Sequence, residues 1–238
     1  MKEFKSGFIH SIETMGLLDG PNIRIVIFMQ GCPLRCIFCH NPDTWGKTSN
    51  KKFTSKEIVD LVRKYRPYIE NGGGVTFSGG EPLFQSEFLL ETLKLCKKAG
   101  IHTCIDTSGT GYNKKYLSDI LKYTDLVLLD IKAITSSKYT EITGSKIDSF
   151  EYFVNVLNKS NTKVWIRQVI IPTINDNQEY ILGFKEYIKK INNIEKIELL
   201  PYHTMGVSKY EKLNIEYKLK DIDPMDLDRL KNLEELLK

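Results

Sequence analysis

The sequence predicts an α/β fold, a partial (β/α)6 barrel of parallel strands that is open on one side. Short apolar segments rich in β-branched residues recur along the 238-residue chain, and segments of helical periodicity separate them. This alternation favours a parallel sheet with right-handed crossovers. The six repeats are too few to close an eight-stranded TIM barrel, so we expect a TIM-like barrel with a lateral gap.

The six predicted strands are short and mostly apolar, as strands buried on both faces of a parallel sheet usually are. In chain order they are residues 23–29 (IRIVIFM), 72–80, 101–109, 125–133, 163–172 and 195–203.

The intervening segments carry helix start and stop signals. Thr54-Ser-Lys-Glu57 is a capping box, because the Thr54 side chain and the Glu57 side chain each accept from the other's backbone amide. The helical stretch 88–100 ends in a glycine. Asp223-Pro224 has the pattern of an N-cap with proline at the first helical position, which predicts a final helix over 224–238. Further helices are expected over residues 114–122, 149–158 and 178–190.

Composition and charge indicate one domain spanning residues 1–238. The net charge is +4, but the lysines are scattered, so we expect no nucleic-acid partner. The N-terminus lacks the apolar core of a signal peptide, and no apolar run is long enough to span a membrane. Three of the five cysteines fall in one loop, which favours a reducing cytoplasm over a disulfide framework. We expect a monomer.

Polar or glycine-rich clusters follow five of the six predicted strands. Such clusters at the carboxyl ends of barrel strands build the active site in folds of this kind. The sequence therefore predicts a functional site at this edge. The clusters are Cys32, Ser78-Gly79-Gly80-Glu81, Asp106-Thr107, Asp130 with Lys132, and His203.

The loop 31–41 holds Cys32, Cys36 and Cys39 in a C-x3-C-x2-C pattern. One interpretation is zinc, with His40 or a distant residue as the fourth ligand, although His40 directly follows Cys39 and fits poorly on the same ion. A second is an iron–sulfur cluster with three thiolate ligands, which leaves one iron with an open coordination position. The third is three buried structural cysteines.

The cysteine pattern after the first strand and Gly-Gly-Glu-Pro (residues 79–82) after the second resemble the radical S-adenosylmethionine superfamily. The resemblance implies a [4Fe-4S] cluster on Cys32, Cys36 and Cys39, whose open iron binds S-adenosylmethionine. One electron then cleaves this cosubstrate to methionine and a 5′-deoxyadenosyl radical. It also implies a low-potential electron donor, flavodoxin or ferredoxin.

The resemblance extends over most of the chain to the pyruvate formate-lyase activating family. It implies that the chain generates a glycyl radical on the glycine loop of pyruvate formate-lyase under anaerobic conditions. Alternatives are a radical enzyme acting on another glycyl-radical enzyme or a small molecule, and a non-catalytic iron–sulfur or zinc module. The matching segments are IHSIET, LLDGPNIR, FMQGCPLRCIFCHNPDTW, GGGVTFSGGEP, GIHTCIDTSG, TDLVLLDIK, KVWIRQVIIP and EKIELLPYH.

The same resemblance implies three sets of site residues. Asp19 and Arg167 are expected to contact the partner peptide. A monovalent cation, Na+ or K+, is expected on Asp106, Thr107, Asp130 and the backbone of Leu128. The S-adenosylmethionine site is expected to comprise Phe38, Cys39, His40, Gly79, Gly80, Glu81, Asp106, Asp130, Ile131, Lys132 and His203.

Three departures from the family pattern stand out. Asn22 replaces the last glycine of Asp-Gly-Pro-Gly, in a turn position that tolerates asparagine at positive φ. Phe38 replaces a loop tyrosine. No cysteine lies between Cys39 and Cys96, so the ferredoxin-like insert of some relatives is absent, and Cys96 and Cys104 are expected in the core.

Overall fold

The computed structural model describes residues 3–49 and 51–237. The described residues form one eight-stranded sheet in the order β3-β1-β2-β4-β5-β6-β7-β8. From β2 to β8 neighbouring strands are parallel and follow the chain order. The end strands β3 and β8 are not paired with each other, so the sheet is an open partial barrel, as predicted.

All six predicted strands are confirmed, each shortened by one to four residues. They are β2 (Arg24–Met29), β4 (Gly74–Gly79), β5 (His102–Thr107), β6 (Leu126–Asp130), β7 (Lys163–Ile170) and β8 (Ile194–Pro201). Their register aligns the carboxyl ends, since Met29 pairs with Gly79 and Asp130 pairs with Arg167. This alignment brings the polar residues that follow each strand to one edge of the sheet.

Two antiparallel strands at the edge of the sheet were not predicted. β1 (Ser6–Gly16) pairs with β2 on one side and with β3 (Lys52–Thr54) on the other. β1 mixes half-buried and exposed side chains, and β3 has only three residues. Neither segment therefore resembles the short, mostly apolar segments between helices that identified the six parallel strands.

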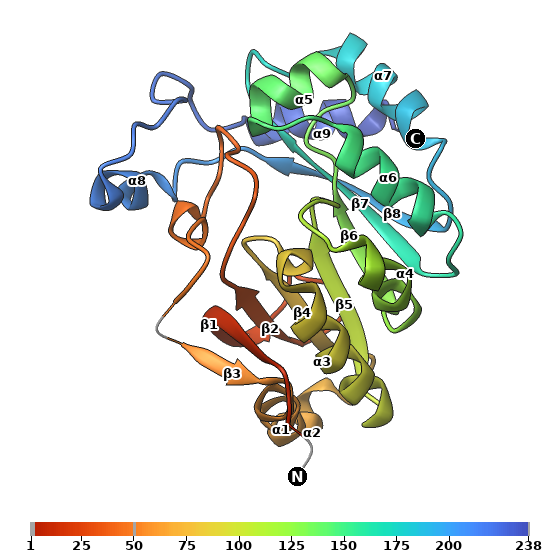
Figure 1. The fold of residues 1–238 in the computed structure, drawn as a ribbon. Coiled ribbons are helices and arrows are strands. Elements are labelled where there is room, and N and C mark those ends of the chain that lie inside the picture. Colours follow the sequence, from red (N-terminus) through yellow and green to blue (C-terminus); the bar gives the residue numbers. More distant parts are fainter. Residues whose placement is uncertain (1–2, 50, 238) are drawn as a thin grey trace.

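The helices lie mainly along the outer face of the curved sheet, where α3, α4 and α6 pack against one another in sequence order (Figure 1). The predicted capping box at Thr54 and Glu57 is present at the start of α1. The helix bounds are α1 (Ser55–Lys64), α2 (Arg66–Ile69), α3 (Ser86–Lys98), α4 (Lys114–Lys122), α5 (Ser136–Thr143), α6 (Asp148–Leu157), α7 (Gln178–Ile188), α8 (Val207–Leu213) and α9 (Leu227–Glu235), with short 3-10 turns η1 (Pro42–Thr44) and η2 (Pro82–Gln85).

The prediction for the last helix was wrong at its start. α9 begins at Leu227, and its N-cap is Asp226, whose side chain accepts from the backbone amide of Arg229. Asp223-Pro224 lies in the preceding loop, so the cap three residues later sets the helix. The helix ends at Glu235, and the predicted endpoint, residue 238, lies outside the described residues. The helices α2, α5 and α8 were not predicted.

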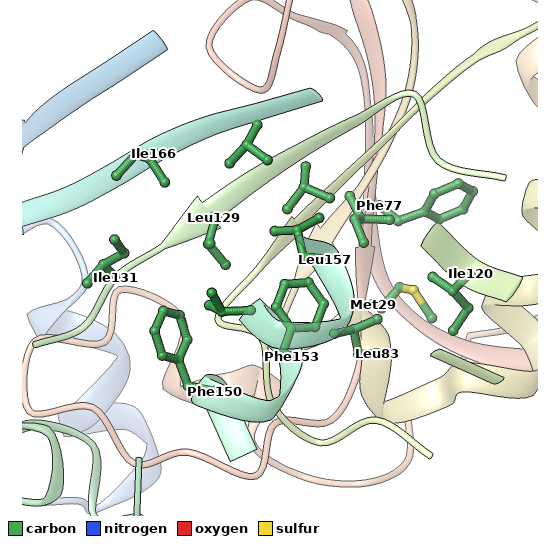
Figure 2. Close-up of a cluster of buried hydrophobic side chains, with 14 of the residues drawn as sticks. Met29, Phe77, Leu83, Ile120, Leu129, Ile131, Phe150, Phe153, Leu157 and Ile166 are labelled. Carbon is green, nitrogen blue, oxygen red and sulfur yellow. The ribbon is translucent and has the colours of Figure 1, made fainter. Parts of the chain in front are cut away.

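The core fills the layer between the sheet and the outer helices. Figure 2 shows Leu129 and Ile166 from the sheet beside Phe150, Phe153 and Leu157 from α6, all of them buried. Leu128, the neighbour of Leu129 on the opposite face, lies inside the barrel with Cys104, Leu126 and Trp165. Cys96 and Cys104 are fully buried, as predicted. Among the described residues, no helix combines the length and apolar character required to cross a bilayer.

Candidate functional site

A cavity of about 260 Å³ opens at the carboxyl edge of the parallel strands. Residues from β4, β5, β6 and β7, and from the loops after β2 and β8, line it. The position matches the edge at which the sequence predicted the site. The predicted residues that line it are Cys32, Cys36, Phe38, Cys39, His40, Ser78, Gly79, Gly80, Asp106, Thr107, Asp130, Lys132, Arg167 and His203.

The cysteine loop is held on two sides by backbone hydrogen bonds. At its start, the amide of Gly31 donates to the carbonyl of Thr44, and the amide of Glu81 donates to the carbonyl of Gly31, both at 2.8 Å. On the other side the amides that flank Cys36 donate to the last turn of α5. These bonds run from Arg35 to Thr143 at 2.8 Å and from Ile37 to Ile142 at 2.9 Å.

The three loop cysteines meet around the cavity with little exposure to solvent. Burial raises the pKa of all three thiols, that of Cys36 to about 12, whereas the nearby Lys132 ammonium favours the Cys36 thiolate. Coordination to iron removes the thiol protons, so this positive charge suits a bound anionic cluster. Within the described residues, no three His, Cys, Asp or Glu side chains converge on a single metal ion. In a four-iron cluster, by contrast, each thiolate binds a different iron.

The segment around α8 forms the outer wall of the cysteine loop (Figure 1). The Tyr210 hydroxyl donates to the carbonyl of Cys39 at 2.9 Å, and Lys209 Nζ donates to Asn41 Oδ1 at 2.7 Å. The rings of His40 and His203 meet edge to face with centroids 4.5 Å apart. The C-terminal part of the chain therefore closes the cluster loop.

Gly79 and Gly80 line the cavity, and neighbouring backbone requires both of them to be glycine. Gly79 has a φ of +106°, and a Cβ there would lie 2.4 Å from the backbone nitrogen of Met29. A Cβ on Gly80 would lie 2.3 Å from the carbonyl oxygen of Gly31. The two glycines thus let the cysteine loop cross directly over the end of β4, and they leave backbone at the cavity wall.

Charged groups of both signs face the cavity from β5, β6 and β7. Lys132 Nζ lies 2.6 Å from Asp130 Oδ2, and Ser78 Oγ donates to Asp106 at 2.8 Å. Burial and the Asp130 carboxylate raise the pKa of Asp106 to about 6. Burial disfavours the Lys132 charge, but Asp130 and Cys36 outweigh it and raise the pKa of Lys132.

This donor set fits S-adenosylmethionine, which carries an ammonium, a carboxylate and a sulfonium. Asp106 and Asp130 suit its cationic groups, and Lys132 and Arg167 suit its carboxylate. The fit has further support at His203, whose Nδ1 is buried and has no hydrogen-bond partner among the described residues. A buried polar atom without a partner is costly in the free protein, so a bound ligand is a natural partner.

Asp19 and Arg167 are electrostatic neighbours, because burial raises the pKa of the Asp19 carboxyl and the Arg167 guanidinium partly offsets this rise. Arg167 donates from Nε to Glu198 at 3.1 Å and from Nη2 to the carbonyl of Leu18. Asp19 is half-buried, and its carbonyl accepts from Thr76 Oγ1 at 2.6 Å, whereas no hydrogen bond reaches its carboxylate within the described part of the chain. The turn is as expected, with Asn22 at a φ of +56°.

Three predicted residues lie behind the cavity wall. Ile131 is buried in the main core, and Leu128 packs inside the barrel below Asp130. Glu81 is 1% exposed and accepts hydrogen bonds from the backbone amides of Leu83 and Ser108 and from the hydroxyls of Thr107 and Ser108. Glu81 therefore anchors the turn after β5, including the side chain of Thr107.

Glu81→Ala is expected to lower the free energy of unfolding by about 3 kcal/mol, since four buried donors lose their acceptor together. Denaturant unfolding of the anaerobic protein measures this effect. Glu81→Gln retains one acceptor oxygen and should lose less. Equal stability of the alanine variant and the parent would show that the turn does not depend on Glu81.

The pH dependence of the free energy of unfolding provides a second test of the role of Glu81. Burial raises the pKa of Glu81 from 4.5 to about 7, so ionisation of this group opposes folding. Its contribution to stability is therefore complete below about pH 4.5 and declines as the pH rises to about 7. Because Glu81→Gln does not titrate, the stability of the parent relative to this variant should fall across that window. A constant difference would contradict the effect of burial.

Sequence reasoning missed several residues of the wall. In the sequence, these residues have no pattern of their own that marks them as part of a site; they lie only close to a predicted strand or to one of the cysteines. The contacts of Tyr210 and Lys209 had no sequence signal, because both residues lie more than 160 positions from the loop they hold. The missed lining residues are Leu34, Asn41, Ser108, Val169, Leu200, Pro201 and Tyr202.

The fold and the cavity together define a class of protein, a partial α/β barrel that carries a loop of three cysteines at its carboxyl edge. The radical SAM superfamily model matches residues 26–184. The pyruvate formate-lyase-activating enzyme of Clostridium pasteurianum is 54% identical over 98% of this chain and 97% of that protein. The enzyme of the same name from Staphylococcus epidermidis is 43% identical over 94% of this chain and 92% of that protein.

The chain belongs to the radical SAM superfamily and, within it, to the family of the pyruvate formate-lyase-activating enzymes. Solved structures agree on the fold. Streptococcus suis SuiB bound to its precursor peptide SuiA has a TM-score of 0.68 at 22% identity, over 94% of this chain and 46% of SuiB. A domain of the pyruvate-formate lyase-activating enzyme of Bacteroides vulgatus has a TM-score of 0.56 at 24% identity, over 70% of this chain and 93% of that domain.

Proposed function

We propose that this chain activates pyruvate formate-lyase by generating a glycyl radical on it under anaerobic conditions. When bound, the [4Fe-4S] cluster and S-adenosylmethionine supply the 5′-deoxyadenosyl radical that removes a hydrogen atom from the partner's glycine. The observation that carries the proposal is the meeting of three cysteines and four charged side chains in one cavity, in a chain that matches the relatives nearly end to end.

We assign the cluster to Cys32, Cys36 and Cys39 and the cosubstrate to the cavity beside them. The Asp130–Lys132 pair orients the charged methionyl groups, and the His203 Nδ1 atom forms a hydrogen bond to the cosubstrate. The adenosine part would be held by the remaining wall, which includes Phe38 and His40. Glu81 and Ile131 support this wall from behind without touching the ligand.

A monovalent cation is proposed between Asp106 and Asp130, with the backbone of Leu128 nearby. Burial, and after it the nearby Asp130 carboxylate, raises the pKa of Asp106, and a cation between the two carboxylates would relieve their repulsion. Thr107 is proposed as a further ligand, since its hydroxyl donates to Glu81 at 2.6 Å and its oxygen lone pairs are not used by that donation. The identity of the cation, Na+ or K+, is decided by comparing activity in each salt.

Three further assignments concern the protein in its cell. Flavodoxin or ferredoxin is proposed as the electron donor, since reductive cleavage of a sulfonium requires a low potential. The five cysteines are free thiols, which suits the reducing cytoplasm. A monomer is proposed, with pyruvate formate-lyase as a transient partner.

Asp19→Ala is expected to slow glycyl-radical formation on pyruvate formate-lyase at least tenfold. The Asp19 carboxylate is held at the lateral opening by its rigid turn and is free of internal hydrogen bonds within the described residues, so it is available to position a peptide. Electron paramagnetic resonance of the partner, mixed anaerobically with the activated chain, measures the radical. Absence of a radical with the unaltered chain would overturn the proposed function in favour of a small-molecule radical enzyme.

The control is reductive cleavage of S-adenosylmethionine without the partner, which Asp19→Ala should leave nearly unchanged. Asp60→Ala, at an exposed position on α1, serves as a matched carboxylate far from the opening. If Asp19 only stabilises its turn, both rates and the melting temperature fall together.

A further inference from the structure

Tyr139 in α5 has a buried hydroxyl without a hydrogen-bond partner. Its side chain is 0% exposed, and among the described residues nothing accepts from or donates to its Oη atom. The ring itself packs against Phe150, with the two ring centroids 6.1 Å apart. A buried hydroxyl that forms no hydrogen bond costs roughly 1–3 kcal/mol, and phenylalanine would pack equally well here. The hydroxyl therefore calls for a partner that the polypeptide itself does not supply.

The position of Tyr139 points to the cysteine loop. Tyr139, Ile142 and Thr143 share one face of α5, because residues three and four apart lie above one another on a helix. The same turn of α5 accepts the backbone amides on either side of Cys36, at 2.8 and 2.9 Å. The backbone around Cys36 is thus held at the C-terminal end of α5, about one helical turn beyond Tyr139. The electrostatic neighbours of the phenol agree, since burial and then Cys36 raise the pKa of Tyr139 and keep it protonated.

We propose that the Tyr139 hydroxyl donates a hydrogen bond to a sulfur atom of the iron–sulfur cluster at its Cys36 corner, and that this bond raises the reduction potential of the cluster. The proposal rests on the assignment of the cluster to Cys32, Cys36 and Cys39. In the free protein Cys36 is a neutral thiol and a weak acceptor, whereas thiolates and sulfides of a cluster carry negative charge. A phenol that is too buried to ionise is a suitable donor to them.

The direction of the effect follows from charge. One-electron reduction makes the cluster more negative, so a hydrogen bond to its sulfur stabilises the reduced form more than the oxidised form. Tyr139 is therefore a positioning residue that eases delivery of the first electron. Tyr139 lies in α5, whereas the proposed peptide contacts lie in β7 (Arg167) and between β1 and β2 (Asp19), so its loss should act on reduction and leave partner binding intact.

The test is the midpoint potential of the anaerobically reconstituted protein, followed by electron paramagnetic resonance without S-adenosylmethionine. Tyr139→Phe removes one oxygen and keeps the ring. At a fixed potential of the donor couple, the reduced-to-oxidised ratio should fall by about tenfold, which corresponds to about 59 mV for one electron. Iron and sulfide contents should match the parent. In the parent, one proton coupling to the reduced cluster should disappear when the buffer is deuterated. Tyr139→Phe should lack this exchangeable coupling.

Tyr187→Phe is the matched control. Its hydroxyl is also buried without a partner among the described residues, but the charge that acts on it is Glu151, not a cysteine. This variant should keep the parent's potential. Unchanged potential in Tyr139→Phe with full iron content would overturn the proposal, as would equal shifts in both variants. If a buried water instead bonds to both hydroxyls, both variants should change in stability and neither in potential. That result would also overturn the proposal. If the parent itself binds no iron, the cluster assignment fails instead.

Discussion

Cys36→Ala is expected to abolish iron binding as a four-iron cluster and, with it, all cleavage of S-adenosylmethionine. Cys36 is the most enclosed of the three loop thiols, lying between the two amides that bind α5. Two thiolates cannot retain a cluster that already has one open iron. The variant should still fold, because the loop's own backbone hydrogen bonds to Thr44, Ile142 and Thr143 do not involve the sulfur.

Iron and sulfide analysis, the visible spectrum and circular dichroism measure this result together. Cys96→Ala is the matched control, since Cys96 is fully buried in α3 and belongs to the hydrophobic core. It should keep the cluster and lose only the roughly 1 kcal/mol expected when a small buried side chain is removed. Full iron content and activity in Cys36→Ala would refute the cluster assignment.

Asp130→Asn is expected to weaken S-adenosylmethionine binding by about 10- to 100-fold. The substitution keeps the shape of the side chain but removes the charge that pairs with Lys132 at 2.6 Å and that would face a cationic ligand. Hydrogen bonds to charged groups contribute about 1.5–3 kcal/mol, which corresponds to this range. Titration of the cluster's spectrum with S-adenosylmethionine measures the dissociation constant.

Asp125→Asn, at the opposite end of β6, provides a control. Asp125 immediately precedes β6 and pairs with Lys97 at 2.6 Å, whereas Asp130 ends β6 at the cavity. Both substitutions remove a carboxylate from a lysine pair, so both should cost some stability. Only Asp130→Asn should change the dissociation constant. Equal affinity in both variants would mean that Asp130 serves the fold alone.

The parallel part of the fold was predictable because its signals are local. Each of the six strands is a short segment rich in apolar and β-branched residues, and Thr54 with Glu57 marks a helix start within four residues. Parallel strands connected by helices share one carboxyl edge, so residues that follow different strands were expected to meet. Asp106, Asp130 and Arg167 do meet there. The final helix was misplaced because two aspartates three residues apart are both suitable caps, and only the structure shows that Asp226 is used.

By itself, the sequence determined the open α/β barrel, the cysteine loop and the charged edge, since hydrophobic period and residue spacing encode these features. Tertiary structure alone decided which polar groups face the cavity and which support it. Glu81 turns into the wall because Thr107 and Ser108 supply its donors. Tyr210 reaches Cys39 across 171 positions of the chain, a contact without local pattern. Tyr139 acquires its significance only from the packing of α5 beside Cys36, because burial without a partner is a property of the folded chain.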